Sequence, residues 1–227
     1  MRNSGTIQSQ LNEIESLLSS VDILDERVFH NSDYLAGVIG VERRDGYIGG
    51  YEYCISTRKF DFRLKNHSLL QFAWKDDTCT FRYLEAPLEV VDYEEFVTEV
   101  FGFEGEDAVE LGDALREEYA AYTETAGLKK TILPIRYDYD SSSYKAGHHP
   151  AAHIHIGYST PLRIENDRQM NPLSFVYFIL RHQYPYEWLR VLDSRDCRSI
   201  ARSIRDSLQT IPAKFQQPED KAHLRLW

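Results

Sequence analysis

The sequence contains little cysteine. Its 227 residues include 3 cysteines, Cys54, Cys79 and Cys197, which lie far apart and form no CxxC pair. An odd and sparse set of this kind argues against a disulfide framework and indicates reduced thiols in a reducing compartment. A metal site, if there is one, cannot be built from these cysteines alone.

Long apolar segments are also missing. The longest strongly apolar run, from Pro172 to Leu180, is about half as long as a membrane span. The amino-terminal stretch MRNSGTIQSQLNEIESLL has no apolar core of signal-peptide length. We therefore expect a cytoplasmic protein that does not associate with membranes.

An excess of basic residues is absent as well. The formal net charge is −10 and the isoelectric point is near 5.3. A protein that coats nucleic acid nonspecifically needs a basic surface to neutralise phosphates, so that class is disfavoured, whereas a small nucleotide or a local basic groove is not. The sequence also has no Walker loop, no GxGxxG and no GxSxG motif.

The first 85 residues predict one helix followed by strands. Apolar residues recur at helical spacing from Ile7 to Val21, which predicts an amphipathic helix over 5–21. From 34 to 85 the apolar period falls to two, as in Tyr51, Tyr53 and Ile55. We expect a meander of four or five antiparallel strands there, including a hairpin in which Leu70, Phe72 and Trp74 face Cys79, Phe81 and Tyr83.

The rest of the chain predicts two helical regions around a pair of strands. Residues 92–126 have helical spacing, and Gly127 is expected to end this region with a left-handed cap. Strands are expected over 132–158, and helices over 171–208 with Asn171 as the cap. The polar tail after Pro212 is expected to pack loosely. The predicted fold class is α+β, a single domain over 1–227 with a mostly antiparallel sheet and flanking helices.

Acidic residues gather in one segment. Residues 85–118 contain thirteen acids and one base, Arg116. A solvated surface explains such a run, and an acidic docking face for a basic protein partner is the alternative.

The candidate site lies in the strand pair. Alternate side chains of a strand share a face, so His153 and His155 project together, away from the apolar Ile154 and Ile156. If residues 132–140 pair with 151–158, a polar face also receives Arg136, Asp138 and Asp140. The connecting loop adds His148 and His149.

These residue types suit two kinds of chemistry. Imidazole with carboxylate binds zinc, manganese or iron, and an aspartate beside a histidine orients it for acid–base catalysis. We expect His153, His155, Asp138 and Arg136 to be catalytic; the cofactor stays open, and a divalent metal is one candidate. A polar, half-exposed strand surface without function is the alternative.

A second candidate site, a row of arginines, is expected on the last helix. Arg195, Arg198, Arg202 and Arg205 are spaced three, four and three apart, so they project within one sector of a helix. With His148, His149 and Asp140 they form the predicted ligand-binding set, and the arginines would hold phosphates or an acidic partner. An ordinary solvated helix face is the alternative.

Two blocks carry a resemblance to a known family. The block GHHPAAHIHIG at 147–157 and the block NPLSFVYFILRHQYP at 171–185 resemble an uncharacterised bacterial family of unknown function. The resemblance implies a bacterial cytosolic protein, with relatives near mobile or phage-defence genes. It supplies no catalytic residues.

Two functions lead among those open from the sequence, and a metal- or nucleotide-binding regulator without turnover is a third. The first is a phosphoester hydrolase acting on RNA or a nucleotide, as a bacterial defence or toxin effector, through the site of histidines, aspartate and arginine. The second is a non-catalytic accessory or sensor protein that binds a protein partner encoded nearby. A concave pocket that brings His153, His155 and Asp138 within ligand distance favours the first.

Overall fold

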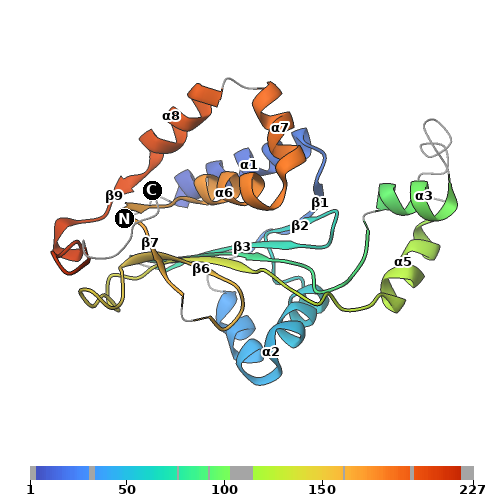
Figure 1. Ribbon diagram of the computed structural model, residues 1–227, viewed down its shortest axis with the longest axis horizontal. Coiled ribbons are helices and arrows are strands. Elements are labelled where there is room, and N and C mark those ends of the chain that lie inside the picture. The colour runs from blue at the N-terminus through green and yellow to red at the C-terminus, as the bar shows by residue number, and fades with distance from the viewer. Residues whose placement is uncertain are drawn as a thin grey trace.

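A seven-stranded antiparallel sheet forms the centre of the protein, with helices on both faces (Figure 1). The computed structural model describes residues 4–30, 34–75, 77–91, 93–102, 115–160, 162–194 and 197–220. The predicted α+β class is confirmed. Within these residues, every helix is too short or too polar to cross a lipid bilayer.

The strands lie in the sheet in the order in which they occur in the chain, from β1 to β7. Their bounds are β1 Leu24–Arg27, β2 Phe62–Leu64, β3 Leu69–Lys75, β4 Thr78–Leu84, β5 Ile135–Tyr139, β6 Ala152–Ile156 and β7 Ile164–Glu165. The expected hairpin is confirmed, because Leu70, Phe72 and Trp74 pair with Tyr83, Phe81 and Cys79. A separate two-stranded sheet joins β8 (Arg168–Gln169) to β9 (Gln209–Thr210).

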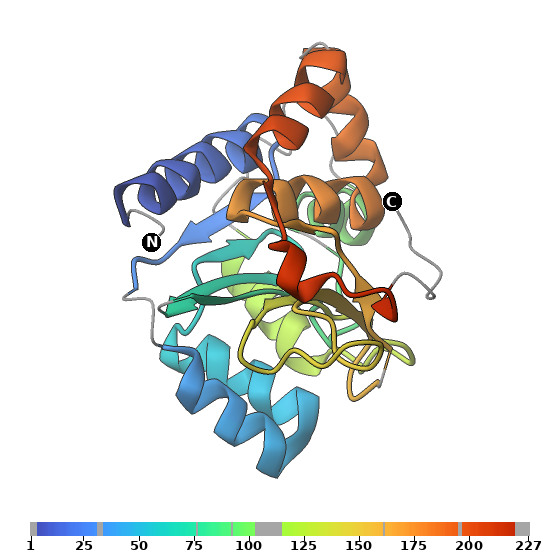
Figure 2. The same cartoon turned by 90° about the vertical axis from the view of Figure 1, so that its left-hand side faces the viewer.

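One face of the sheet packs on α1 (Ser4–Ser20) and α6 (Pro172–Gln183), as Figure 2 shows edge-on. The stripe of apolar residues that predicted the first helix is buried in this core, which also contains Phe72, Phe81 and Phe175. Asn171 caps α6 as expected, since its side chain accepts from the Ser174 amide. Beyond α6 lie α7 (Pro185–Ser194) and α8 (Cys197–Ser207), and η1 (Ala213–Phe215) follows β9.

The other face is covered in part by α2 (Leu35–Thr57), and here the sequence prediction was wrong. Residues 34–57 were predicted as strands. They form a helix that buries Val38, Tyr51 and Cys54 and is kinked at Gly46, whose φ is +76°. The kink divides the helical period into two short runs, which is why an alternating pattern could be inferred instead.

A further correction concerns the end of a helix. The helical region between β4 and β5 contains α3 (Tyr93–Phe101) and α5 (Arg116–Thr125), to the side of the sheet in Figure 1. Ala126 ends α5 in an extended conformation, so the predicted left-handed cap at Gly127 is wrong. Residues 103–114, the centre of the acidic segment, lie outside the described residues.

The tail after Pro212 packs more closely than expected. The Asp220 side chain is buried and accepts hydrogen bonds from the Tyr144 hydroxyl (2.5 Å) and the Gly147 amide (2.7 Å). These bonds fasten the loop that carries His148 and His149 to the carboxyl-terminal segment.

A buried carboxyl group lies under α2. Asp61 is 5 % exposed and accepts hydrogen bonds from the Tyr34 hydroxyl and the Phe72 amide. Burial raises the pKa of Asp61 to about 7, although these two bonds oppose the shift. The folded state therefore holds this proton more tightly than the unfolded chain, whose aspartate pKa is about 3.9. The resulting stabilisation is complete below about pH 4 and is lost as the pH rises through 7.

We predict that the free energy of unfolding of the wild type, minus that of Asp61→Asn, falls by roughly 2 kcal/mol between pH 5 and pH 8. Denaturant unfolding at several pH values measures this difference. Other titrating groups are common to both proteins, so they drop out of the comparison. A difference that does not change over this range would show that Asp61 titrates in the folded protein as it does in the unfolded chain.

Candidate functional site

The candidate residues come together because β5 and β6 pair in the predicted way. Asp138 lies opposite His153, and Arg136 lies opposite His155. Directly opposed residues of an antiparallel pair share a face, so these side chains lie on the face turned away from α1 and α6. The topological prediction from the sequence is confirmed.

Three donor atoms converge on this face. Asp138 Oδ2 lies 3.6 Å from His155 Nε2 and 3.9 Å from His153 Nε2. All three donors lie within 4.8 Å of one another, and this is the one such group of histidine, cysteine and carboxylate side chains among the described residues. Donor atoms on a tetrahedral zinc ion lie roughly 3.3 Å apart, given metal–ligand distances of about 2.0 to 2.1 Å. A small contraction of the cluster would therefore accommodate an ion.

The protonation of the histidines suits a metal ligand. His153 and His155 are 2 % and 7 % exposed, and burial lowers the pKa of both, that of His155 to about 4 with a further contribution from Arg136. Both rings are therefore neutral at pH 7. His153 Nδ1 lies 2.9 Å from the Pro150 carbonyl, which only accepts, so Nδ1 carries the proton. The lone pair of Nε2 then points toward the cluster, as in most metal-bound histidines.

The carboxylate of Asp138 is held from two sides. Thr80 Oγ1 donates to Oδ1 (2.9 Å), and Arg136 forms an ion pair with Oδ2 through Nε (2.8 Å). Such outer contacts fix a ligand's orientation before an ion arrives. Thr80 is opposite Asp138 in the sheet and was not recognised from the sequence.

The two loop histidines differ in position, since His149 lines the candidate site and His148 does not. The His149 ring packs edge-on against His153, with centroids 4.9 Å apart, and lines the same hollow. Asp140 also lines it, and its carboxylate accepts from Ser142 and Ser143. His148 is exposed and does not line the hollow.

The arginine face of α8 is not part of this site. Arg202 and Arg205 are exposed on a helix that lies beyond the opposite face of the sheet (Figure 1). Arg195 and the side chain of Arg198 lie outside what the structure describes. The phosphate-binding role predicted for these arginines therefore stays a prediction, separate from the histidine cluster.

Two connected hollows surround the cluster. The smaller one, about 280 Å³, contains His149, His153 and Arg163. The wider cleft, about 800 Å³, has α2 as its far wall, with Glu42 and Arg43. Both are lined by Arg136, Asp138 and His155, whereas His153 lines only the smaller one, so the cluster lies where the two hollows adjoin.

Arg82 and Arg163 were missed from the sequence. Arg82 does alternate with the core residues Phe81 and Tyr83, and it lies opposite Arg136, so its place on the polar face was readable from the hairpin. Arg163 stands in a short connection and gives no such signal.

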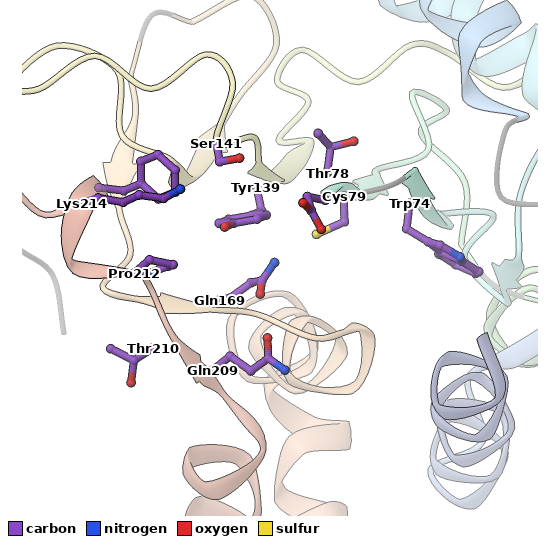
Figure 3. A pocket seen from close by; sticks show the side chains of 12 residues that line it. Trp74, Thr78, Cys79, Tyr139, Ser141, Gln169, Gln209, Thr210, Pro212 and Lys214 are labelled. Carbon is purple, nitrogen blue, oxygen red and sulfur yellow. The ribbon is translucent and has the colours of Figure 1, made fainter. Parts of the chain in front are cut away.

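A third hollow, about 320 Å³, opens at the ends of β4 and β5 (Figure 3). It is lined mainly by neutral side chains, among them Tyr139, Gln169 and Gln209 (Figure 3), together with the charged Asp77 and Lys214. It contains no group of converging metal ligands, so the histidine cluster is the stronger candidate.

A family profile matches residues 20–225, which is most of the chain. The protein belongs to the family described as uncharacterized conserved protein (DUF2290). A search of curated proteins and a search of solved structures returned no match. The family description states no activity, so function has to be argued from the site.

We predict that the metal-stripped protein binds one Zn²⁺ or Mn²⁺ per chain. An ion at about a hundred times its dissociation constant stabilises the folded state by about 2.7 kcal/mol, which raises the melting temperature by several degrees. Asp138→Asn and His155→Gln should each weaken binding by about a hundredfold or more, because each changes a candidate ligand and the loss of even an outer contact to a ligand costs about 10- to 100-fold. Calorimetric titration and thermal melts measure both effects.

His148→Gln is the matched control for these variants. It removes an exposed histidine from the same part of the chain and should leave metal binding unchanged. Binding that depends on His148 as much as on His155 would place the ion outside the cluster.

Proposed function

We propose that this protein is a metal-dependent hydrolase of phosphoesters, acting on RNA or a nucleotide. The observation that carries the proposal is the convergence of Asp138, His153 and His155 within 4.8 Å, where two hollows meet. A flat, solvated histidine face would have favoured the accessory-protein alternative.

The donor set determines which ions fit. Two neutral imidazoles and one carboxylate suit Zn²⁺, Mn²⁺ and Fe²⁺, and leave coordination positions for water and substrate. A divalent ion bound in this way supplies a water whose pKa is lowered toward neutrality. The role of the three side chains is to hold that ion at the junction of the hollows.

The surrounding charge favours an anionic substrate. The chain carries a net charge of −10, yet Arg43, Arg82, Arg136 and Arg163 line the two hollows. Three carboxylates line them too, and each has a partner in the protein: Glu42 pairs with Arg82, Asp138 with Arg136, and Asp140 accepts from Ser142 and Ser143. A bound dication would therefore leave the site locally positive, as a phosphoester requires.

Arg136 has a specific role in this proposal. Its side chain is half-exposed, lines both hollows, and is paired with Asp138 through Nε, which leaves the other guanidinium nitrogens for a ligand. There it would donate to a phosphate oxygen and stabilise the charge that develops during hydrolysis. The setting expected from the family resemblance, a bacterial defence or toxin system, belongs to the same proposal.

The double variant His153→Gln/His155→Gln tests the activity. Glutamine keeps approximate size and hydrogen bonding, but loses the imidazole ligands. We expect hydrolysis of single-stranded RNA or of a generic phosphodiester, assayed with Mn²⁺ or Zn²⁺, to fall by about a hundredfold or more. Thermal melts of the metal-free proteins check that the variant folds, and His148→Gln should keep full activity.

A folded double variant that keeps wild-type activity would end the enzyme proposal. The accessory-protein function, with the acidic segment or the exposed arginines as docking surface, would then take its place. A double variant that loses activity only in proportion to its unfolded fraction would have the same consequence.

A further inference from the structure

The wide cleft has a feature that metal binding does not use. Tyr158 and Ile39 belong to the large apolar side chains that the described residues expose, and both line this otherwise polar cleft. Tyr158 is 44 % exposed although it is held in place. Its hydroxyl donates to the Glu42 carbonyl (3.2 Å), and its ring packs edge-on against Tyr47, with centroids 5.4 Å apart. An aromatic ring that is both exposed and oriented is suited to stacking a planar ligand.

The floor of the cleft has a second unusual arrangement. Arg82 and Arg136 are directly opposed in the β4–β5 ladder, on the same face. Like charges in this position repel one another unless anions lie between or beside them. Arg136 is bound to Asp138, and Arg82 is bound through Nη2 to Glu42.

Arg82 has binding capacity left. The residue is 7 % exposed, and its Nη1, which is itself buried, has no hydrogen-bond partner among the described residues. A buried guanidinium with an unsatisfied nitrogen is costly, and a phosphate oxygen is the acceptor that it binds best. Arg82, Arg136 and His155 lie side by side across three neighbouring strands, so a phosphate at the arginines would lie beside the candidate metal site.

The Tyr158 ring and the Arg82 guanidinium lie close enough together to bind one ligand. Glu42 contacts both, through its carbonyl to Tyr158 and through its carboxylate to Arg82. A single glutamate residue thus spans the distance between the Tyr158 ring and the Arg82 guanidinium. This distance is comparable with that from base to phosphate in a nucleotide.

We infer that the wide cleft binds a nucleotide unit, with its phosphate at Arg82 and Arg136 and its base stacked on Tyr158. This inference rests on the proposed function, whose substrate it names: single-stranded RNA or a free nucleotide, in which the base is unpaired and accessible. Recognition by stacking accepts every base, because each has a π-face, so little sequence preference is expected.

Calorimetric titration with three probes tests the inference: adenosine 5′-monophosphate, ribose 5-phosphate and inorganic phosphate. The wild type should bind adenosine monophosphate about tenfold or more tightly than ribose 5-phosphate, since stacking of a base contributes about that much. Tyr158→Ala should abolish this preference and leave ribose 5-phosphate binding unchanged. Tyr158→Phe, which keeps the ring, should keep the preference.

Arg82→Lys tests the phosphate end. Lysine keeps the charge beside Glu42 but has no second nitrogen in a planar fork. Binding of adenosine monophosphate and of ribose 5-phosphate should weaken by the same factor, so that the ratio of the two affinities stays as in the wild type. No loss for either probe would remove Arg82 from the ligand site.

Equal affinity of the wild type for the nucleotide and the sugar phosphate would overturn the inference, and equal affinity for inorganic phosphate would indicate a phosphate site alone. Repeating the titrations with metal-stripped and with Zn²⁺-loaded protein distinguishes failure of the nucleotide inference from failure of the proposed hydrolase function. A Tyr158-dependent preference in a protein that binds no metal would leave the nucleotide site standing and end the hydrolase proposal. Metal-dependent hydrolysis without a base preference would leave the hydrolase proposal standing and end the nucleotide inference.

Discussion

The register of β5 between β4 and β6 is the constraint on which both the core and the candidate site depend. The pairing that places Tyr137 opposite Phe81 in the core places Asp138 opposite Thr80 and His153 on the other face. A shift by one residue would exchange the two sets of side chains. The contact between the rings of Phe81 and Tyr137, with centroids 5.6 Å apart, therefore helps to position the candidate ligands, although it lies on the far side of the sheet.

Bringing three lone-pair donors together is unfavourable in the absence of a cation, and the surroundings of the cluster reduce this cost. Burial keeps the two histidines neutral, so they do not repel each other as charges, and Arg136 and Thr80 balance the carboxylate of Asp138. The bond from His153 to the Pro150 carbonyl keeps a lone pair directed inward. Such an arrangement is preorganised for an ion, since little has to move when the ion binds.

The sequence was sufficient to predict a helix or strand where one periodic pattern continued through the whole element. Alternation in 132–158 predicted both strands and the shared face, because Ile135, Tyr137 and Ile154 are apolar at every second position. It was insufficient for 34–57, where tyrosines and glycine pairs resemble strands and turns while the helical spacing is broken at Gly46. The pairing of Arg82 with Glu42 joins residues 40 positions apart, and no local pattern encodes it.

The segment that was mispredicted is also the one that completes the cleft. A β-carbon on Gly50 would lie 2.2 Å from Glu42 Cγ, so the missing side chain leaves the space that Glu42 occupies. From there Glu42 reaches both Arg82 and Tyr158. Had 34–57 formed strands, the candidate metal ligands of β5 and β6 would still share a face, but they would have no opposing wall. The sheet thus supplies the groups for chemistry, and α2 supplies the enclosure without which those groups would face open water.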